Sequence, residues 1–277
     1  MMLERAINLA DYLVHLQGNG RLCFTRGEAL AATGLSSAAF MKAAMRLQRK
    51  HLLFTPRQGF YVVVPPQFHF WQAPPPSWYI DELMRHERRH YYVGLLKAAE
   101  LHGATHNAVM EFQVMTDRQL PKIRAGRSYL VFYFRKEIEP VLCAVEQHRT
   151  ATGTMAVSSV ELTCLDLMRY ANAVGGFSAV ATILVDLGEK IDADKLVVLA
   201  RHFERASLQR LGYLLDHLGH ERTTEPLYRQ LYTQPSVPWV KLDPARGANR
   251  LLFPAGDYAE RNRRWRVVAQ HLPEIDE

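Results

Sequence analysis

Hydrophobic residues near the start of the chain recur every three or four positions, which is the spacing of an amphipathic helix. Two such segments predict the first two helices, one from residue 3 to near Gly18 and one over residues 26–33. Thr25 stands just before the second segment, where its hydroxyl can accept a backbone N–H, and Glu28 can complete a capping box. The second helix is therefore expected to begin directly after Thr25.

A third helix is predicted over residues 37–50, after a short turn. Gly34 suits the left-handed backbone of that turn, and Ser36 can cap the helix that follows. At about 100° per residue, one face of this helix is apolar and consists of Phe40, Ala43, Ala44 and Leu47. Two short helices joined by a glycine turn indicate a helix-turn-helix.

A basic hairpin is predicted next. Two strand-like runs, residues 52–54 and 60–64, flank a Thr-Pro-Arg-Gln-Gly turn in which Arg57 is the basic residue. Residues 21–24 can add a third strand to this hairpin. We therefore predict a winged helix-turn-helix domain over residues 1–66, with the hairpin as its wing.

Positive charge is concentrated in this predicted domain. Residues 1–66 hold eight Lys/Arg and three Asp/Glu, whereas the rest of the chain holds 26 and 25. No acidic residue occurs between Ala29 and Ile80. A face of a single sign suits a polyanion, so the domain is expected to bind double-stranded DNA rather than serve only as a protein contact.

The outer face of the third helix is the one that would enter a major groove. Lys42 is the strong hydrogen-bond donor near its start and is expected to read guanine. The basic residues nearer its end, together with the arginine of the wing, are expected to contact phosphates. The predicted DNA-binding residues are Ser36, Ser37, Ala38, Met41, Lys42, Met45, Arg46, Arg49, Lys50 and Arg57.

The chain beyond the predicted wing has a different pattern. Residues 67–76 combine aromatic residues with prolines and are expected to form an extended strap. Residues 77–277 predict a larger α+β domain with a small sheet and a helical C-terminal half, so the whole chain is of the α+β class. Predicted helices cover residues 78–86, 91–102, 161–173, 177–187, 193–202, 204–218 and 224–232, and predicted strands cover residues 111–115, 129–134 and 155–157. Residues 118–127 are expected to be a basic loop, and residues 235–277 show no readable pattern.

A His-Glu-Arg-Arg-His run at residues 86–90 matches the H-E-x-x-H pattern of zinc enzymes, and Glu111 could serve as a third ligand. Two arginines inside the run oppose a bound cation. We therefore interpret the run as a polar break between two helices and expect no metal.

Motifs of catalysis are absent from the sequence. It contains no G-x-S-x-G elbow, no phosphate-binding Gly-Lys-Ser loop and no Cys-x-x-Cys pair. The three cysteines, Cys23, Cys143 and Cys164, lie among apolar neighbours and are expected to be buried thiols. No long uncharged apolar segment or signal peptide is evident, so a cytoplasmic protein is expected. Because catalytic motifs are absent, we expect that it is not an enzyme and that it needs no cofactor.

Several segments beyond the predicted wing are similar to one known family. They are YYVGLLKAAELHGA at residues 91–104, FQVMT at residues 112–116, SVELTCLDL at residues 159–167 and RLGYLL at residues 210–215. In this order they resemble the AbiEi family of abortive-infection antitoxins, and the resemblance spans roughly residues 1–235. One departure is His51, which stands where the recognition helix of that family usually ends in glycine.

The resemblance implies a type IV antitoxin. Such a protein represses its own operon through the N-terminal domain and counteracts a nucleotidyltransferase-like toxin through the C-terminal one, without needing a stable complex with the toxin. The resemblance also suggests which residues could form the antitoxin surface, meaning the surface that counteracts the toxin. They are polar residues of these segments and of the basic loop. These candidates are Lys122, Arg124, Arg127, Glu161, Asp166 and Arg210. Glu161 and Asp166 could equally cap or brace a helix.

Two alternatives stay open. A stand-alone winged-helix regulator could use its second domain to sense a ligand or a partner unrelated to any toxin. A DNA-processing enzyme with a winged-helix targeting domain would need a carboxylate cluster on the sheet, for which Glu111 and Asp117 alone are insufficient. A nucleotidyltransferase-like reading frame downstream of the gene would favour the antitoxin.

Overall fold

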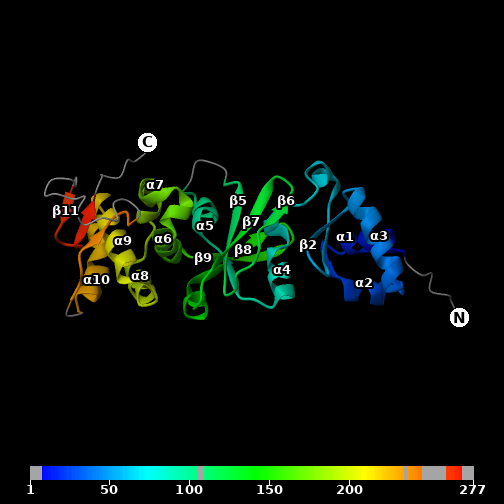
Figure 1. Ribbon diagram of the computed structural model, residues 1–277, viewed down its shortest axis with the longest axis horizontal. Coiled ribbons are helices and arrows are strands. Elements are labelled where there is room, and N and C mark those ends of the chain that lie inside the picture. The colour runs from blue at the N-terminus through cyan, green and yellow to red at the C-terminus, as the bar shows by residue number, and fades with distance from the viewer. Residues whose placement is uncertain (1–7, 105–108, 234–235, 245–259, 270–277) are drawn as a thin grey trace. The chain divides into compact units, whose positions relative to one another are not determined.

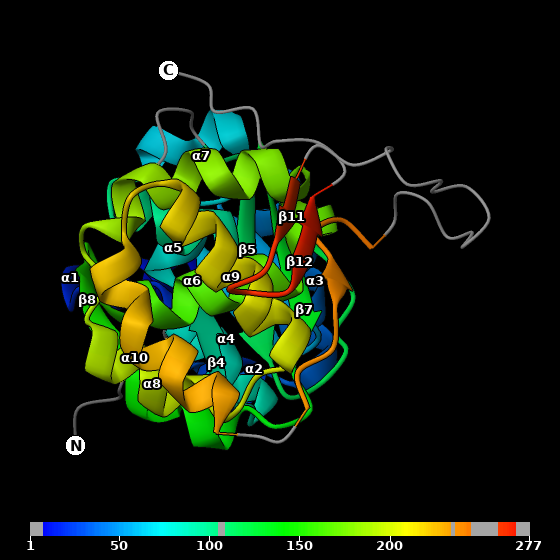
Figure 2. The same cartoon turned by 90° about the vertical axis from the view of Figure 1, so that its left-hand side faces the viewer.

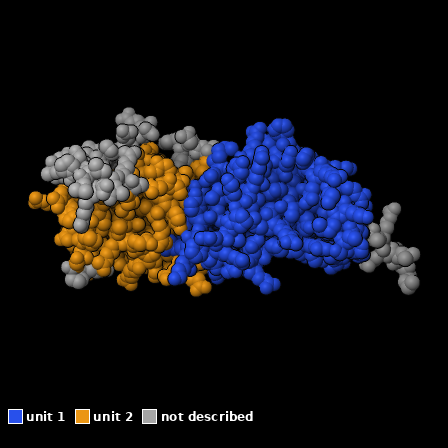
Figure 3. All heavy atoms as spheres, viewed as in Figure 1, with its two compact units in different colours: residues 1–92, 110–136, 147–156 blue, residues 93–109, 137–146, 157–277 orange. Residues whose placement is uncertain are grey.

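A computed structural model of the chain describes residues 8–104, 109–233, 236–244 and 260–269. Its internal contacts divide the chain into two compact units (Figure 3). Unit 1 comprises residues 1–92, 110–136 and 147–156, and unit 2 comprises residues 93–109, 137–146 and 157–277. The domain boundary that the sequence predicts after residue 66 lies inside unit 1, and it stays a prediction.

The N-terminal part of unit 1 consists of helices and a small antiparallel sheet (Figure 1). Its elements are α1 (Leu9–Gly18), β1 (Cys23–Thr25), α2 (Arg26–Thr33), α3 (Ser37–Arg49), β2 (Leu53–Arg57) and β3 (Phe60–Val63). The sheet has the strand order β1-β3-β2, with Cys23 opposite Val62 and Leu53 opposite Val63. These elements confirm the helices and strands predicted over residues 21–64.

Local signals in the sequence set the ends of α2 and α3. Thr25 Oγ1 accepts the Glu28 N–H at 3.2 Å, and a Glu28 carboxylate oxygen accepts the Thr25 N–H at 2.6 Å, so the predicted capping box is present. Gly34 ends α2 in the left-handed region at a φ of 66°, where glycine carries no steric penalty. Ser36 Oγ accepts the Ala39 N–H at 3.2 Å and so caps α3 as predicted.

The prediction of an extended strap over residues 67–76 is wrong in its first half. The chain there forms a 3₁₀ helix, η1 (Pro66–Trp71), and a second 3₁₀ turn, η2 (Pro76–Trp78), precedes α4 (Ile80–Glu87). Pro66 occupies a first-turn position of η1, where its fixed φ favours the turn and its missing N–H has no helical partner to lose.

The helix predicted over residues 91–102 begins later than expected. Its first residues form the strand β4 (Tyr91–Val93), and the helix itself is α5 (Leu95–Leu101). All three residues of β4 are buried. Aromatic and β-branched residues that are covered on both faces favour a strand inside a sheet over the first turn of a helix.

β4 belongs to a mixed sheet with the strand order β6-β7-β5-β4-β9-β8. Its other strands are β5 (Glu111–Thr116), β6 (Ile123–Ala125), β7 (Ser128–Phe134), β8 (Val145–Thr150) and β9 (Gly153–Ser158). β5 and β7 pair in parallel, whereas β6 and β7 form an antiparallel hairpin. The three predicted strands are confirmed, but the expected basic loop over residues 118–127 contains β6. The sequence also fails to predict β8, because the polar run Val-Glu-Gln-His-Arg-Thr reads as a loop.

Unit 2 is mainly helical, and α10 packs against both α8 and α9 (Figure 2). Its later elements are α6 (Val160–Arg169), η4 (Ala171–Val174), α7 (Gly176–Gly188), α8 (Ala193–Ala200), α9 (Arg205–His217) and α10 (Glu221–Tyr232). They confirm the helices predicted over residues 161–232, although α6, α8 and α9 end earlier than predicted and α10 begins earlier. Among the described helices, none is long and apolar enough to cross a membrane.

A small sheet follows these helices, in a region where the sequence shows no pattern. It consists of β10 (Val240–Lys241), β11 (Glu260–Asn262) and β12 (Val267–Ala269), in the order β10-β12-β11. The fully buried Trp265 anchors it, since its indole N–H donates to an Asp216 carboxylate oxygen at 2.7 Å. A Cβ atom on Gly212 would lie 2.3 Å from the Trp265 ring, so α9 needs glycine where the ring packs.

The three cysteines are all free thiols. Cys23 and Cys164 are buried as expected, and burial raises the pKa of the Cys23 thiol to about 12. Cys143 is exposed, which corrects the expectation for that residue. It lies in a 3₁₀ helix, η3 (Glu139–Ala144), and its Sγ donates to the Pro140 carbonyl oxygen at 3.5 Å.

Candidate nucleic-acid interface

The outer face of α3 is exposed along its whole length. Near its start this face presents small and apolar side chains around Lys42, and near its end it presents arginines and Lys50. No acidic residue lies on α3. The structure therefore brings nine of the ten predicted DNA-binding residues together on one exposed face: Ser36, Ser37, Ala38, Met41, Lys42, Met45, Arg46, Arg49 and Lys50.

A chain of aromatic rings fixes the rotation of α3 about its own axis. Phe40 is fully buried, and its ring meets Tyr61 of β3 edge-on with ring centroids 5.3 Å apart. Tyr61 stacks on Phe24 of β1 at 5.4 Å, and Phe24 meets Tyr12 of α1 edge-on at 5.5 Å. Because Phe40 points into this cluster, the residues on the opposite side of α3 must point outward.

Polar contacts hold both ends of α3. The Arg26 guanidinium at the start of α2 donates to Ser37 Oγ, and Gln48 Nε2 donates to Thr55 Oγ1 of β2 at 2.6 Å. The sequence does not predict the role of Arg26, since no local motif links it to a residue eleven positions away. On the outer face, Arg46 Nε donates to the Lys42 carbonyl oxygen at 3.2 Å.

His51 follows α3 in the left-handed conformation, with a φ of 57°. A residue with a Cβ atom adopts this conformation at some steric cost, as expected for histidine at this position. The chain nevertheless turns directly into β2, and the hairpin of β2 and β3 forms.

Arg57 does not join the other predicted DNA-binding residues. Its guanidinium donates to the Pro121 carbonyl oxygen at 2.6 Å, lies 3.5 Å from a Glu87 carboxylate oxygen and sits 5.4 Å from the Phe132 ring centroid. Burial lowers the pKa of Arg57, although Glu87 opposes this effect. A phosphate contact by Arg57 stays a prediction, and it would require these internal contacts to open.

The candidate antitoxin residues fall into two groups. Lys122, Arg124 and Arg127 are exposed on the hairpin of β6 and β7 and its approach. Glu161 and Asp166 are only 4% and 0% exposed, so the prediction that they lie on the antitoxin surface is wrong.

The contacts of Glu161 show a bracing role. One carboxylate oxygen accepts the Ser159 hydroxyl at 2.7 Å, and the other accepts the Asp192 N–H at 2.9 Å, which joins the start of α6 to the start of α8. Arg210 is half-buried in the same unit, where its Nε donates to the Lys241 carbonyl oxygen at 2.9 Å and its guanidinium stacks near Phe177. These residues therefore hold unit 2 together.

The H-E-x-x-H run does not form a helical metal site. α4 ends at Glu87, Arg88 is left-handed with a φ of 55°, and His90 lies outside the helix. His86 Nε2 lies 3.2 Å from the Gln58 carbonyl oxygen. In the part of the chain that the structure describes, no group of three or more His, Cys, Asp or Glu is placed to hold a metal ion.

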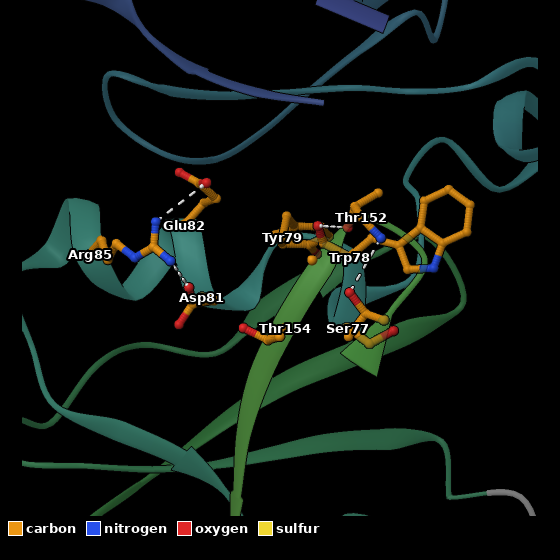
Figure 4. A pocket seen from close by; sticks show the side chains of 10 residues that line it. Ser77, Trp78, Tyr79, Asp81, Glu82, Arg85, Thr152 and Thr154 are labelled. Atoms are coloured by element: carbon orange, nitrogen blue, oxygen red, sulfur yellow. Dashed lines mark hydrogen bonds and ion pairs between the residues drawn. The ribbon is translucent and has the colours of Figure 1, made fainter. Parts of the chain in front are cut away.

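Two cavities in unit 1 are lined by paired charges. The smaller, of about 50 Å³, lies between α4 and the turn from β8 to β9, and there Arg85 pairs with Asp81 and Glu82 (Figure 4). The larger, of about 260 Å³, contains the Arg21–Glu28 ion pair at 2.9 Å. Pockets for small molecules are usually about 300–1,000 Å³ and mostly apolar, so neither cavity favours a small ligand.

Comparison with known proteins connects this fold to a family. Residues 92–217 match the family model of the AbiEi antitoxin C-terminal domain. Over these residues the chain is similar to the C-terminal domain of the AbiEi antitoxins. This confirms the resemblance that the sequence segments suggested.

A solved structure shares the fold of this chain over most of its length. It is the Rv2827c protein from Mycobacterium tuberculosis, with a TM-score of 0.67 and 15% sequence identity over 94% of this chain and 90% of that one. At this identity the likeness shows a shared fold alone. A search of curated proteins finds no match.

Arg57 and Arg49, two of the predicted DNA-binding residues, should respond differently to substitution. Arg57→Ala removes a charged hydrogen bond and leaves Glu87 without that partner, so the free energy of unfolding should fall by about 1–3 kcal/mol. Arg49→Ala, on the exposed face, should change it by no more than about 0.5 kcal/mol. Urea unfolding measures both. Equal stability of the two variants would contradict the placement of Arg57.

Proposed function

We propose that the N-terminal part of unit 1 is a winged helix-turn-helix that binds double-stranded DNA and represses the chain's own operon. In this proposal α3 is the recognition helix, and β2 and β3 form the wing. The observation that carries it is the outer face of α3, which is exposed, basic and free of acids. Such a face releases counterions from a polyanion, and affinity should therefore fall steeply with salt.

Residues on this face divide into two roles in the proposal. Arg46, Arg49 and Lys50 contact phosphates, and Lys42 donates to guanine in the major groove. Ser36, Ser37 and Ala38 are small, so they allow close approach of the helix to the bases.

The two methionines give the reading surface an apolar character. Met41 and Met45 are 44% and 50% exposed, so both side chains are available to a DNA groove. The Tyr61 hydroxyl donates to Met41 Sδ at 3.9 Å and so helps to orient the Met41 side chain. An apolar side chain in the major groove reads the 5-methyl group of thymine.

Replacing thymine by deoxyuridine tests this role of Met41, because the change removes only a methyl group. In a duplex from upstream of the gene, substitution at a contacted thymine should weaken binding about fourfold, as measured by fluorescence anisotropy. The Met41→Ala protein should bind both duplexes equally. If the wild-type protein were insensitive to deoxyuridine at every position, thymine reading by Met41 would be excluded.

The second half of the proposal follows from the similarity to the AbiEi antitoxins. An antitoxin implies a cognate toxin, and we propose that this toxin is nucleotidyltransferase-like. This chain counteracts the toxin in the cytoplasm, and it does so without catalysis and without a cofactor. Lys122, Arg124 and Arg127 are the exposed candidates for the protective surface.

A cell-based experiment tests both halves in the full-length chain. The triple variant Lys42→Ala, Arg46→Ala and Arg49→Ala should lose repression of a reporter driven by the chain's own promoter but still protect cells from the toxin. A matched control removes three exposed arginines away from α3: Arg149, Arg201 and Arg222. This control should keep both activities.

Each half of the proposal can fail separately. Unchanged repression by the triple variant would exclude α3 as the reading helix. Loss of protection by that variant, while the control still protects cells, would contradict the separation of the two activities. Absence of a nucleotidyltransferase-like reading frame next to the gene would favour the alternative, a stand-alone winged-helix regulator.

A further inference from the structure

Unit 1 carries a second exposed surface that the DNA-binding proposal does not use. It is formed by Phe70 and Trp71 of η1 and by Tyr129 of β7, together with the basic residues Lys122, Arg124 and Arg127. We call these six residues the basic-aromatic surface. The three aromatic side chains are 83%, 39% and 38% exposed in the order given. Large exposed aromatic rings that cluster in one place point to a binding surface.

The hairpin of β6 and β7 places the aromatic and basic residues together. Its turn begins at Gly126, where a Cβ atom would lie 2.3 Å from the Trp71 carbonyl oxygen. The turn is therefore seated directly on η1. The Arg127 guanidinium consequently lies 5.8 Å from the Phe70 ring centroid and 5.4 Å from the Trp71 ring centroid.

The same hairpin aligns the remaining members along one face. Arg124 is paired with Tyr129 across the two strands, so their side chains lie on the same side of the hairpin. Lys122 is two residues from Arg124, and its ammonium lies 5.4 Å from the Tyr129 ring centroid. Each exposed ring of the basic-aromatic surface thus has a cation beside it.

The charge around this surface is mostly positive. Residues 118–136 contain six Lys/Arg and no Asp or Glu, and residues 29–80, which include η1, contain no acid either. Glu111 lies beside Tyr129 in the register of β5 and β7. Asp117, the acid just before this stretch, lies 3.7 Å from an Arg89 guanidinium nitrogen. A net positive surface with exposed rings is complementary to a polyanion that also carries flat apolar groups.

We propose that the basic-aromatic surface binds single-stranded nucleic acid. Unpaired bases stack on Phe70, Trp71 and Tyr129, and the phosphates between them are neutralised by Lys122, Arg124 and Arg127. A duplex is a poorer match, because its bases are already stacked on one another and cannot cover the rings. The proposal does not depend on DNA binding by α3, which lies elsewhere in unit 1.

The test uses the full-length chain with Lys42→Ala and Arg49→Ala, so that the predicted duplex-binding face contributes little. The probes are fluorescein-labelled oligo(dT) and oligo(U) of about 20 nucleotides, measured by fluorescence anisotropy over a range of salt concentrations. Phe70→Ala and Tyr129→Ala should each weaken binding roughly 5-fold to 100-fold. Arg124→Ala should reduce the salt slope by about 0.7.

Matched variants separate stacking from a loss of folding. Phe70→Trp and Tyr129→Phe keep a ring and should keep the affinity. Val14→Ala changes another exposed apolar residue of unit 1, on α1, and should have no effect. Affinity for a fully paired duplex of the same length should not change in Phe70→Ala or Tyr129→Ala.

Three results would overturn the proposal. One is the absence of oligonucleotide binding at low salt. Another is a loss of affinity in Arg124→Ala but not in Phe70→Ala or Tyr129→Ala, which would show a purely electrostatic surface. The third is a loss of toxin protection in Arg124→Ala with unchanged oligonucleotide affinity, which would identify a protein as the partner of this surface.

Discussion

Burial of Phe40 against Tyr61 is the interaction on which the proposed interface depends. An isolated helix of this length has no preferred rotation, so its outer face is set only by what its inner face contacts. The edge-on contact between these rings, continued through Phe24 to Tyr12, supplies that orientation. Lys42, Arg46 and Arg49 can form a continuous basic face only because Phe40 occupies the opposite side.

The sequence predicts this part of the fold well because its signals are local. A capping box, a left-handed glycine and a serine cap each depend on residues within four positions of one another. The same holds for the apolar stripe of α3. By contrast, the contacts of Arg57 with Pro121 and Phe132 span more than sixty residues, and nothing near Arg57 in the sequence signals them.

Tertiary context also explains the errors in the larger domain. Tyr91–Val93 continues a helical pattern, yet burial within the sheet makes it a strand. Glu161 looks like a surface acid in the sequence, but its two carboxylate oxygens join Ser159 to Asp192. The segments that resemble the family at residues 159–167 and 210–215 therefore contain residues that hold the helices of unit 2 in place, as Gly212 does beneath Trp265.

Binding of α3 in a DNA groove is the central claim, and hydrogen–deuterium exchange of the full-length chain tests it most directly. Exchange is compared with and without a duplex from upstream of the chain's own gene, and with a scrambled duplex at the same salt concentration. The account predicts that residues 37–49 exchange more slowly with the upstream duplex and that the scrambled duplex protects them less. Unchanged exchange across α3, with protection confined to other segments, would contradict it.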